Sequence, residues 1–374
     1  MSSSREHNGA NAAMKHSPQS LNLVQRVSLT AYGEVPRLDP ASLQGKKVCV
    51  IVCGMHRTGT SAMTRVVNLL GADIAKRLVA PKPDNIRGYW EASAIVGIHN
   101  DLLQRLGTSS ADPLPLPEGW LESISAQEAR CKLAGMIKSE FADSDLFVVK
   151  DPRVSRLLPL WLDLLDELGI EAVVVVPFRN PLEVAASLKA RDRMSLAASL
   201  ILYAYSYLET ERASRGRRRC FVGYDQFLED WHELERKLRD ILGTRLPQVG
   251  HEQSKAIESY LTADLRHHRF SRDELDRLPH VPGIVADLFD CLNDAADRGD
   301  SASLRRSFDE IRRHADDAVM LFRELIISER AVLSEHIHIM EGSTSWRLTA
   351  PLRWIKDGPS ALARSLSSRL RSQP

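Results

Sequence analysis

The sequence predicts an α/β fold in which helices flank a doubly wound, mostly parallel sheet. Three apolar runs have the length and composition of buried parallel strands: residues 48–53, 146–149 and 172–178. Segments whose apolar residues recur at helical spacing lie between these runs, as they do in βαβ units. The 374 residues are 43% hydrophobic, which is enough for one large domain with extensions.

The flanking elements follow in chain order. Residues 1–45 are rich in Ser, Asn and Ala and predict a flexible segment. Apolar residues at helical spacing predict a helix over 61–70, which Gly71 would end, and another over 157–168. A further helix is expected after Pro181, because proline is favoured at the first helical position.

The second half of the chain changes in texture. Residues 220–222 predict another strand, preceded by a basic run at 215–219 that we expect to be a solvated loop. Residues 303–340 are charged and carry an apolar stripe, which predicts an amphipathic or coiled helix. The last 30 residues hold six Arg or Lys against one Asp, interleaved with aromatic and aliphatic residues. We therefore expect a flexible segment, an α/β domain, a helical extension and a basic amphipathic tail over residues 1–45, 46–270, 271–344 and 345–374.

Composition excludes some classes of function. A formal net charge of +1 argues against a globally basic nucleic-acid-binding protein. The five cysteines lack metal-site spacing and no signal sequence is evident, so we expect reduced thiols and a cytoplasmic setting. No apolar run reaches the roughly 18 residues needed to cross a bilayer, so we expect a soluble protein.

Residues 54–61, Gly-Met-His-Arg-Thr-Gly-Thr-Ser, are nearly a Walker A loop. Gly54, Gly59 and Ser61 occupy the positions that the G-x-x-x-x-G-K-[ST] pattern requires, but Thr60 stands where the lysine belongs. Backbone N–H groups at the start of the following helix can still cradle a phosphate. The lysine that grips the β/γ-phosphates of ATP or GTP is missing. The loop therefore predicts a phosphate-bearing ligand that is handled by different chemistry.

Three basic residues follow three of the predicted elements of the sheet. Arg57 lies in the loop after the first predicted strand, Lys150 directly follows the second and Arg179 directly follows the third. Ligands of doubly wound sheets bind at the carboxyl ends of the strands. We therefore expect these three cations to converge on one crevice.

The sequence resembles bacterial members of the P-loop sulfotransferase superfamily. The resemblance rests on residues 54–61 and on the segment Asp84-Asn-Ile-Arg-Gly-Tyr-Trp-Glu91, and it covers about residues 47–270. It implies a kinase-like P-loop α/β sheet and transfer of a sulfuryl group from 3′-phosphoadenylyl sulfate (PAPS) to a hydroxyl or amine. It also implies that no metal takes part.

The resemblance implies roles for individual residues. Arg57 stands where many members have a lysine and would stabilise the leaving group, the alternative being that it only positions phosphate. Arg179 and Ser187 match a pair that binds the donor's 3′-phosphate. Lys150 would contact the sulfuryl or bridging oxygen, or else form a salt bridge with Asp151 or Glu91. The implied donor-binding residues are Arg57, Thr58, Gly59, Thr60, Ser61, Arg179, Ser187 and, in a late basic cluster, Arg266.

The catalytic base has two candidates. Glu91 lies in the region where tyrosylprotein sulfotransferases place a glutamate base, and His99 follows one to two helical turns later. Glu91 would alternatively only orient the acceptor or pair with Arg87. His56, inside the loop, is expected to shape it. The implied catalytic residues are Arg57, Glu91 and Lys150.

The C-terminal tail suggests the pathway in which the protein acts. Residues 345–353, Ser-Trp-Arg-Leu-Thr-Ala-Pro-Leu-Arg, resemble an ending found in bacterial glycosyltransferases that build surface polysaccharides. We expect a carbohydrate or glycolipid acceptor and glycan-biosynthesis enzymes as partners. The tail either contacts the inner face of an anionic membrane peripherally or packs on the domain. The alternatives to a sulfotransferase are a P-loop kinase and a non-catalytic nucleotide-binding scaffold, and neither the acceptor nor the oligomeric state follows from the sequence.

Overall fold

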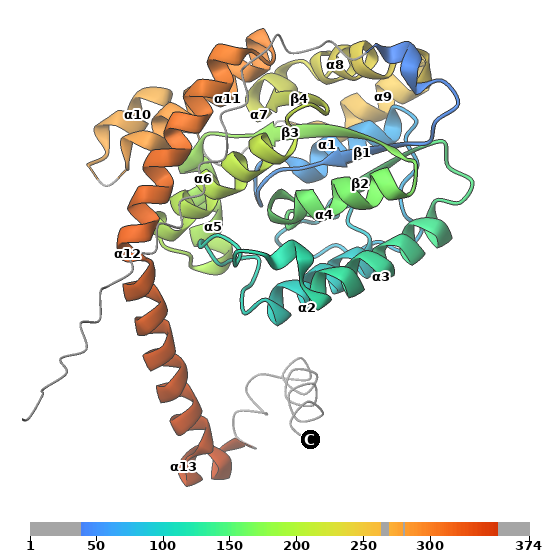
Figure 1. Ribbon diagram of the computed structural model, residues 1–374. Helices are drawn as coiled ribbons and strands as arrows, with labels where there is room; N and C mark the ends of the chain where they lie inside the picture. Colours follow the sequence, from blue (N-terminus) through green and yellow to red (C-terminus); the bar gives the residue numbers. More distant parts are fainter. Residues whose placement is uncertain (1–38, 263–268, 280, 351–374) are drawn as a thin grey trace, which may run out of the picture. The chain divides into compact units, whose positions relative to one another are not determined.

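The computed structural model describes residues 39–262, 269–279 and 281–350. Four parallel strands form one sheet in the order β2-β1-β3-β4 (Figure 1). Their bounds are Val48–Val52 for β1, Leu146–Lys150 for β2, Glu171–Phe178 for β3 and Arg218–Gly223 for β4. The predicted α/β fold, with a parallel sheet flanked by helices, is confirmed.

Helices connect and cover these strands. The α-helices of the described residues are α1 (Thr60–Leu69), α2 (Ser93–Arg105), α3 (Ile124–Glu140), α4 (Val154–Glu167), α5 (Pro181–Asp192), α6 (Leu196–Ala213), α7 (Tyr224–Glu229), α8 (His232–Leu242), α9 (His251–Tyr260), α10 (Arg272–Arg277), α11 (Gly283–Arg298), α12 (Ala302–Gly342) and α13 (Thr344–Leu348). Short 3-10 turns occur at Pro40–Leu43, Trp120–Glu122 and Gly243–Arg245.

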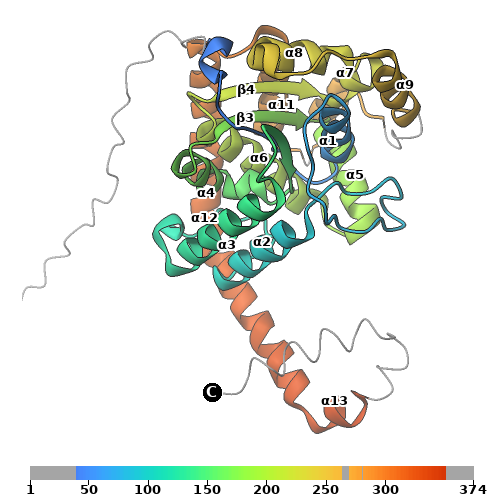
Figure 2. The same cartoon turned by 90° about the vertical axis from the view of Figure 1, so that its right-hand side faces the viewer.

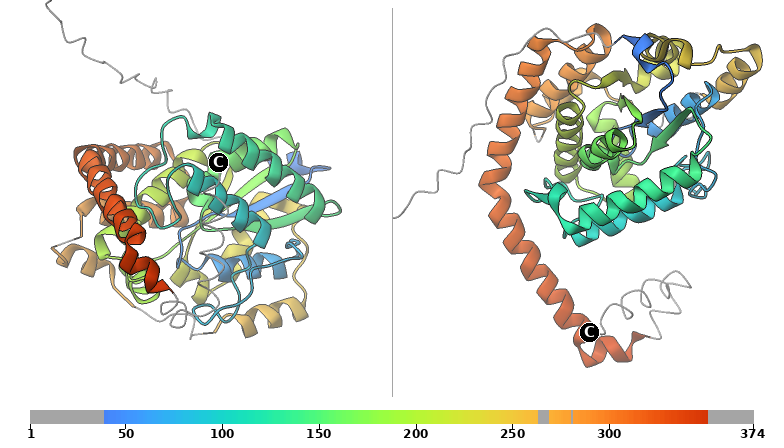
Figure 3. Two further views of the ribbon diagram at one scale, coloured as in Figure 1. Left: turned by 90° about the horizontal axis from the view of Figure 1, so that it is seen from below. Right: turned by 45° about the vertical axis from the view of Figure 1, so that its right-hand side comes forward.

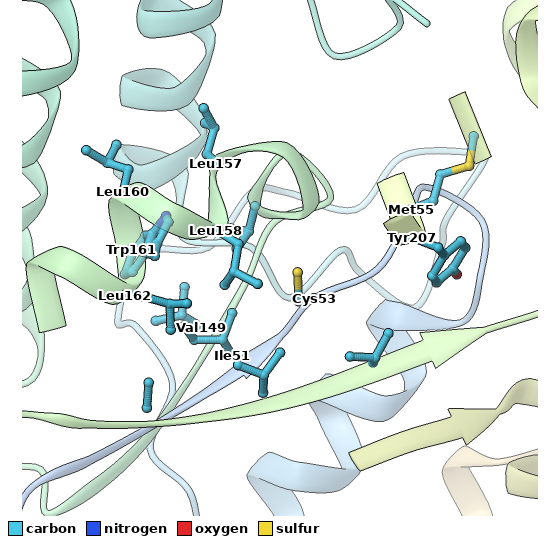
Figure 4. Packing of buried hydrophobic residues seen from close by; sticks show 14 of the residues in the cluster. Ile51, Cys53, Met55, Val149, Leu157, Leu158, Leu160, Trp161, Leu162 and Tyr207 are labelled. Carbon is cyan, nitrogen blue, oxygen red and sulfur yellow. The ribbon is translucent and has the colours of Figure 1, made fainter. Parts of the chain in front are cut away.

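Both faces of the sheet are covered by helices (Figure 2). Cys49 and Ile51 of β1 pack on one side with residues of α4 and α6, whereas Val48 and the alternate residues after it pack on the other side with α1 and α8. Figure 4 shows part of the first cluster, including Leu158 and Trp161. Burial on both faces explains why the strands are continuous apolar runs rather than alternating ones.

The helix α5 begins at the carboxyl end of β3, next to the site described below. Pro181 opens it, and the Asn180 side chain accepts a hydrogen bond of 2.9 Å from the backbone N–H of Leu182. Both are standard N-terminal signals, since proline needs no donor there and a capping side chain satisfies one N–H of the first turn. The helix predicted after Pro181 is therefore confirmed.

The long helix α12 contains 41 residues (Figure 3), and the helix predicted over 303–340 is confirmed. Its first turns bury Phe308, Ile311 and Ala315 and contact α6 and α11. The Tyr205 hydroxyl donates to the Ala315 carbonyl at 3.0 Å. The described apolar side chains between residues 320 and 348 are largely exposed, Leu325 among them. No helix in the described ranges is long and apolar enough to span a membrane.

The expectation of a solvated loop over 215–219 is wrong for its last two residues. Strand β4 begins at Arg218, and the side chains of Arg218 and Arg219 are only 3% and 4% exposed. Arg219 forms ion pairs of 3.1 Å with Glu211 and 2.8 Å with Asp300. These acidic partners make burial of the arginine tolerable, because a buried charge needs a paired one.

Candidate active site

The loop between β1 and α1 is shaped by two glycines. A Cβ on Gly59 would lie 2.1 Å from the Tyr224 ring, and the residue has a φ of 87°. A Cβ on Gly54 would lie 2.8 Å from the Pro177 carbonyl oxygen. Arg57 also has a positive φ, of 69°, which turns the loop back toward the helix. Only glycine fits at the two contact positions, so the loop approaches its neighbours closely.

The hydroxyls of this loop have different surroundings. Thr58 is fully buried and its hydroxyl donates to the Met55 carbonyl at 2.8 Å. Its side chain is therefore committed inside the loop, and contact of Thr58 with a ligand would have to come from the backbone. The Ser61 hydroxyl instead donates to the Tyr89 carbonyl at 3.2 Å and accepts from Lys150 at 3.2 Å.

A cavity of about 300 Å³ opens beside the loop. We call it the donor cavity because most of the donor-binding residues expected from the sequence line it. It collects side chains from the ends of β2 and β3, from α5 and from the segment 83–91. The predicted residues that line it are Arg57, Gly59, Thr60, Ser61, Glu91, Lys150, Arg179 and Ser187. Arg266 lies outside the described residues. The expected convergence of three cations from the sheet edge is thus observed.

Arg57 and Ser187 contact each other directly. The Arg57 Nε donates to the Ser187 hydroxyl at 2.8 Å, and Nη1 donates to the Asp84 carbonyl at 3.3 Å. Burial, followed by the charge of Arg191, lowers the pKa of Arg57. Ser187 was expected to act with Arg179, so its contact with the loop arginine is a difference that the linear spacing could not reveal.

Lys150 and Glu91 form a buried ion pair at the floor of the donor cavity. Lys150 Nζ lies 2.5 Å from Glu91 Oε1 and also donates to the Tyr89 carbonyl at 3.1 Å. The two residues are 3% and 7% exposed. The salt bridge left open by the sequence is therefore present, and both partners still border the cavity.

The backbone before Glu91 has an unusual conformation. Trp90 has a φ of 57°, which is strained for a bulky residue. Its indole N–H donates to the Tyr260 hydroxyl at 3.1 Å, and the Arg65 guanidinium lies over the indole at 4.6 Å. These contacts hold Trp90 against α1 and α9, while the next residue, Glu91, reaches Lys150.

His99 is part of the core. It has no exposed surface, its Nδ1 lies 2.9 Å from Asp151 Oδ2, and the Trp161 indole N–H donates to Nε2 at 2.9 Å. Nε2 is thus an acceptor and Nδ1 donates to the carboxylate. Burial would raise the pKa of Asp151, but the hydrogen bond to His99 and the Arg153 charge outweigh it and hold that pKa below its ordinary range. Both ring nitrogens are engaged, which leaves Glu91 as the candidate base with access to a cavity.

A second cavity of about 530 Å³ adjoins the donor cavity. We call it the acceptor cavity after the role that is proposed for it below. The residues common to both linings are His56, Asp84, Tyr89, Glu91 and Arg191. Burial, followed by the Arg191 charge, lowers the pKa of His56 to about 3, so its imidazole is neutral near pH 7. Glu91 therefore lies at the boundary of two adjoining spaces.

Two residues of α5 were missed in the sequence. Glu183 accepts a hydrogen bond of 2.5 Å from Arg179 Nε, and Arg191 borders both cavities. Together with Arg179 and Ser187 they form a series in which each member lies four residues after the one before it. Residues four apart are neighbours on a helix surface, so this spacing was a usable signal.

No cluster of three or more His, Cys, Asp or Glu side chains that could hold a metal occurs in the described part of the chain. The remaining buried aromatic of the site is Tyr224, whose pKa burial raises to about 12. Its ring lies 4.9 Å from the Arg179 guanidinium.

Comparisons with known proteins give structural neighbours only. No protein-family model matches the sequence, and no curated protein matches it. A sulfotransferase domain from the curacin biosynthetic pathway aligns over 66% of this chain and 98% of its own, with 15% identity and a TM-score of 0.39. Sulfotransferase STF1 from Mycobacterium tuberculosis aligns over 64% and 78%, with 13% identity and a TM-score of 0.35. The sulfotransferase domain of a Synechococcus olefin synthase aligns over 65% and 88%, with 18% identity and a TM-score of 0.34. Identities of 13–18% and TM-scores of 0.34–0.39 do not assign the chain to a family.

Proposed function

We propose that this chain is a sulfotransferase that moves a sulfuryl group from PAPS to a hydroxyl of a carbohydrate or lipid-linked glycan. One observation carries the proposal: Glu91 borders both a cation-lined cavity and a second cavity, and its partner Lys150 borders the first. A carboxylate at such a boundary can take a proton from an acceptor on one side while a cation stabilises a leaving group on the other.

The residues present fit the donor. Arg57, Lys150 and Arg179 border one cavity, and PAPS carries phosphate or sulfate at both ends of its ribose. Gly59, with a φ of 87° and the Tyr224 ring packed where a Cβ would lie, allows the tight turn into α1 that a phosphate cradle needs. Thr60 replaces the lysine that would grip the γ-phosphate of a nucleoside triphosphate, which favours PAPS over ATP.

The reaction would run in line. The acceptor oxygen forms a bond to sulfur as the bond between sulfur and the 5′-phosphate oxygen breaks. The acceptor proton passes to Glu91, and adenosine 3′,5′-bisphosphate leaves. Lys150, 2.5 Å from Glu91, and Arg57 would stabilise the charge that develops on the bridging oxygen. Arg179 and Ser187 would recognise the 3′-phosphate.

The acceptor cavity suits a hydroxyl-rich ligand. Asn100, Ser110 and Arg153 offer hydrogen-bonding groups there, and Val96 and Leu202 supply apolar surface. Ligand sites commonly combine an apolar lining with a few polar groups that fix orientation. The tail begins in α13, and its residues 351–374 lie outside the described ranges. Its peripheral contact with a membrane or with glycan-biosynthesis enzymes stays a prediction, as does a cytoplasmic location.

Calorimetry without magnesium tests the donor. Adenosine 3′,5′-bisphosphate should bind far more tightly than ATP, whereas equal or weaker binding would contradict the proposal. Transfer of label from PAPS carrying sulfur-35 into a cell-envelope glycan fraction tests the reaction. Tight binding without transfer to any fraction would instead indicate a nucleotide-binding scaffold.

A further inference from the structure

Glu183 is a fully buried carboxylate in the first turn of α5. Such a charge is costly unless donors surround it. Its Oε2 accepts from Arg179 Nε at 2.5 Å, and its Oε1 accepts from the backbone N–H of Phe270 at 3.1 Å. The carboxylate therefore joins the arginine of the donor cavity to a backbone segment that is 87 residues further along the chain.

The orientation of Arg179 is fixed on two sides. Glu183 holds the Nε edge of the guanidinium, and the Tyr224 ring lies at 4.9 Å from its central carbon. Arg179 is 7% exposed and borders the donor cavity. An arginine whose plane is already set loses less conformational freedom when it binds a phosphate than one that must first be ordered.

We propose that Glu183 is a positioning residue that makes the donor cavity selective for a nucleotide carrying a 3′-phosphate. The inference rests on the proposed function and on the role of Arg179 within it. Glu183 acts through Arg179 and touches no part of the donor itself. Its loss should weaken binding of adenosine 3′,5′-bisphosphate, but not of adenosine 5′-phosphate, which lacks the group that Arg179 recognises.

The variant Glu183→Gln tests this selectivity. Glutamine has the same length but a single acceptor oxygen, so it cannot accept from both Arg179 and Phe270. Calorimetry with the full chain should show adenosine 3′,5′-bisphosphate binding about 2- to 10-fold more weakly, the cost of ordering one long side chain on binding. Binding of adenosine 5′-phosphate should hardly change. An unchanged ratio between the two affinities would overturn the inference.

Asn180→Ser is the matched control. Asn180 Nδ2 donates to the carbonyls of Phe270 and Ser271 at 2.9 and 3.3 Å, and serine preserves the cap at the start of α5. This variant loosens the same backbone segment without altering the contact between Glu183 and Arg179. The selectivity should stay at its original value. A loss equal to that of Glu183→Gln would show that the effect passes through residues 270–271, and the inference would fail.

A double-mutant cycle covers the case in which Glu183→Gln folds poorly. Glu183→Asp keeps two acceptor oxygens and the charge, and its shorter side chain should give a smaller loss of the same selectivity. In an Arg179→Ala background neither Glu183 variant should change the affinity for adenosine 3′,5′-bisphosphate further, and a further loss would contradict action through Arg179. If the original chain itself shows no preference for the 3′-phosphate, the proposed function fails instead, which separates the two outcomes.

Discussion

Two buried polar pairs begin at consecutive residues where β2 ends, and they differ in what lies beside them. Lys150 pairs with Glu91, and Asp151 pairs with His99. All four residues are at most 7% exposed. The Lys150–Glu91 pair borders the donor cavity, and Glu91 also borders the acceptor cavity. The His99–Asp151 pair is closed by Trp161 instead.

The contrast teaches that charge and burial alone do not distinguish a pair that borders a cavity from one that is enclosed in the core. Successive residues of an extended chain point to opposite sides, so a strand end can send one polar side chain to a ligand space and the next into the core. Access to a cavity is the feature that separates them. Each variant below is directed at one side of this comparison.

Glu91→Gln should have the largest effect. Removing the carboxylate takes away the candidate proton acceptor, so turnover should fall by about 10²- to 10⁴-fold. Affinity for adenosine 3′,5′-bisphosphate should be nearly kept, which calorimetry would show beside labelled sulfuryl transfer. Normal turnover of this variant would remove Glu91 from the mechanism and with it the functional side of the comparison.

His99→Ala should change stability and spare chemistry. The Asp151 carboxylate and the Trp161 N–H would both lose a buried partner, at about 1–3 kcal/mol each, so we expect a loss of about 2–6 kcal/mol. Urea unfolding measures this loss. Turnover per folded molecule should match that of the original chain, and a selective fall in turnover would reopen His99 as the base.

Trp161→Phe isolates one arm of the structural pair. It removes the donor to His99 Nε2 and leaves the His99–Asp151 contact in place, so the expected loss is about 1–3 kcal/mol, near half that of His99→Ala. The midpoint of urea unfolding should shift accordingly, with donor affinity unaltered. A loss as large as that of His99→Ala would mean that the ring packing of Trp161, rather than its N–H, dominates.

Measuring stability against pH tests His56, a residue that borders both cavities. Its pKa is lowered from the ordinary 6.5 to about 3 in the folded chain. Between these values the unfolded chain binds a proton that the folded chain does not, so stability present near pH 7 is lost as the pH falls. From pH 7 to 5 the contribution should decline by up to about 2 kcal/mol, and His56→Gln should lack that decline. Parallel stability curves for the two proteins would contradict the assignment.

The sequence predicted the parts of the site that depend on strand ends. Arg57, Lys150 and Arg179 line one cavity, because the carboxyl ends of parallel strands meet at the same edge of the sheet. The element types were likewise predictable, since buried strands and the helix after Pro181 have strong local signals.

Pairings between distant segments could not be predicted. Ser187 contacts Arg57 across 130 positions, and Arg219 contacts Asp300 across 81. At such separations no local sequence pattern indicates which residues will pair. His99 was a candidate base because its spacing from Glu91 was known and its burial was not. The alternative that Lys150 pairs with Glu91 was open from the sequence, and only the geometry decided it.

Glu183, Ser187 and Arg191, spaced four residues apart on α5, do not lie on a line parallel to the helix axis. A helix turns about 100° per residue, so positions four apart drift by about 40°, and Arg191 is rotated by about 80° from Glu183. Because of that drift, Glu183 is buried beside Arg179, Ser187 borders the donor cavity and Arg191 borders both cavities. The phase of this helix therefore sets which of its side chains reach each cavity. One extra residue between Ser187 and Arg191 would rotate Arg191 by about 100° about the helix axis, away from the wall that the two cavities share.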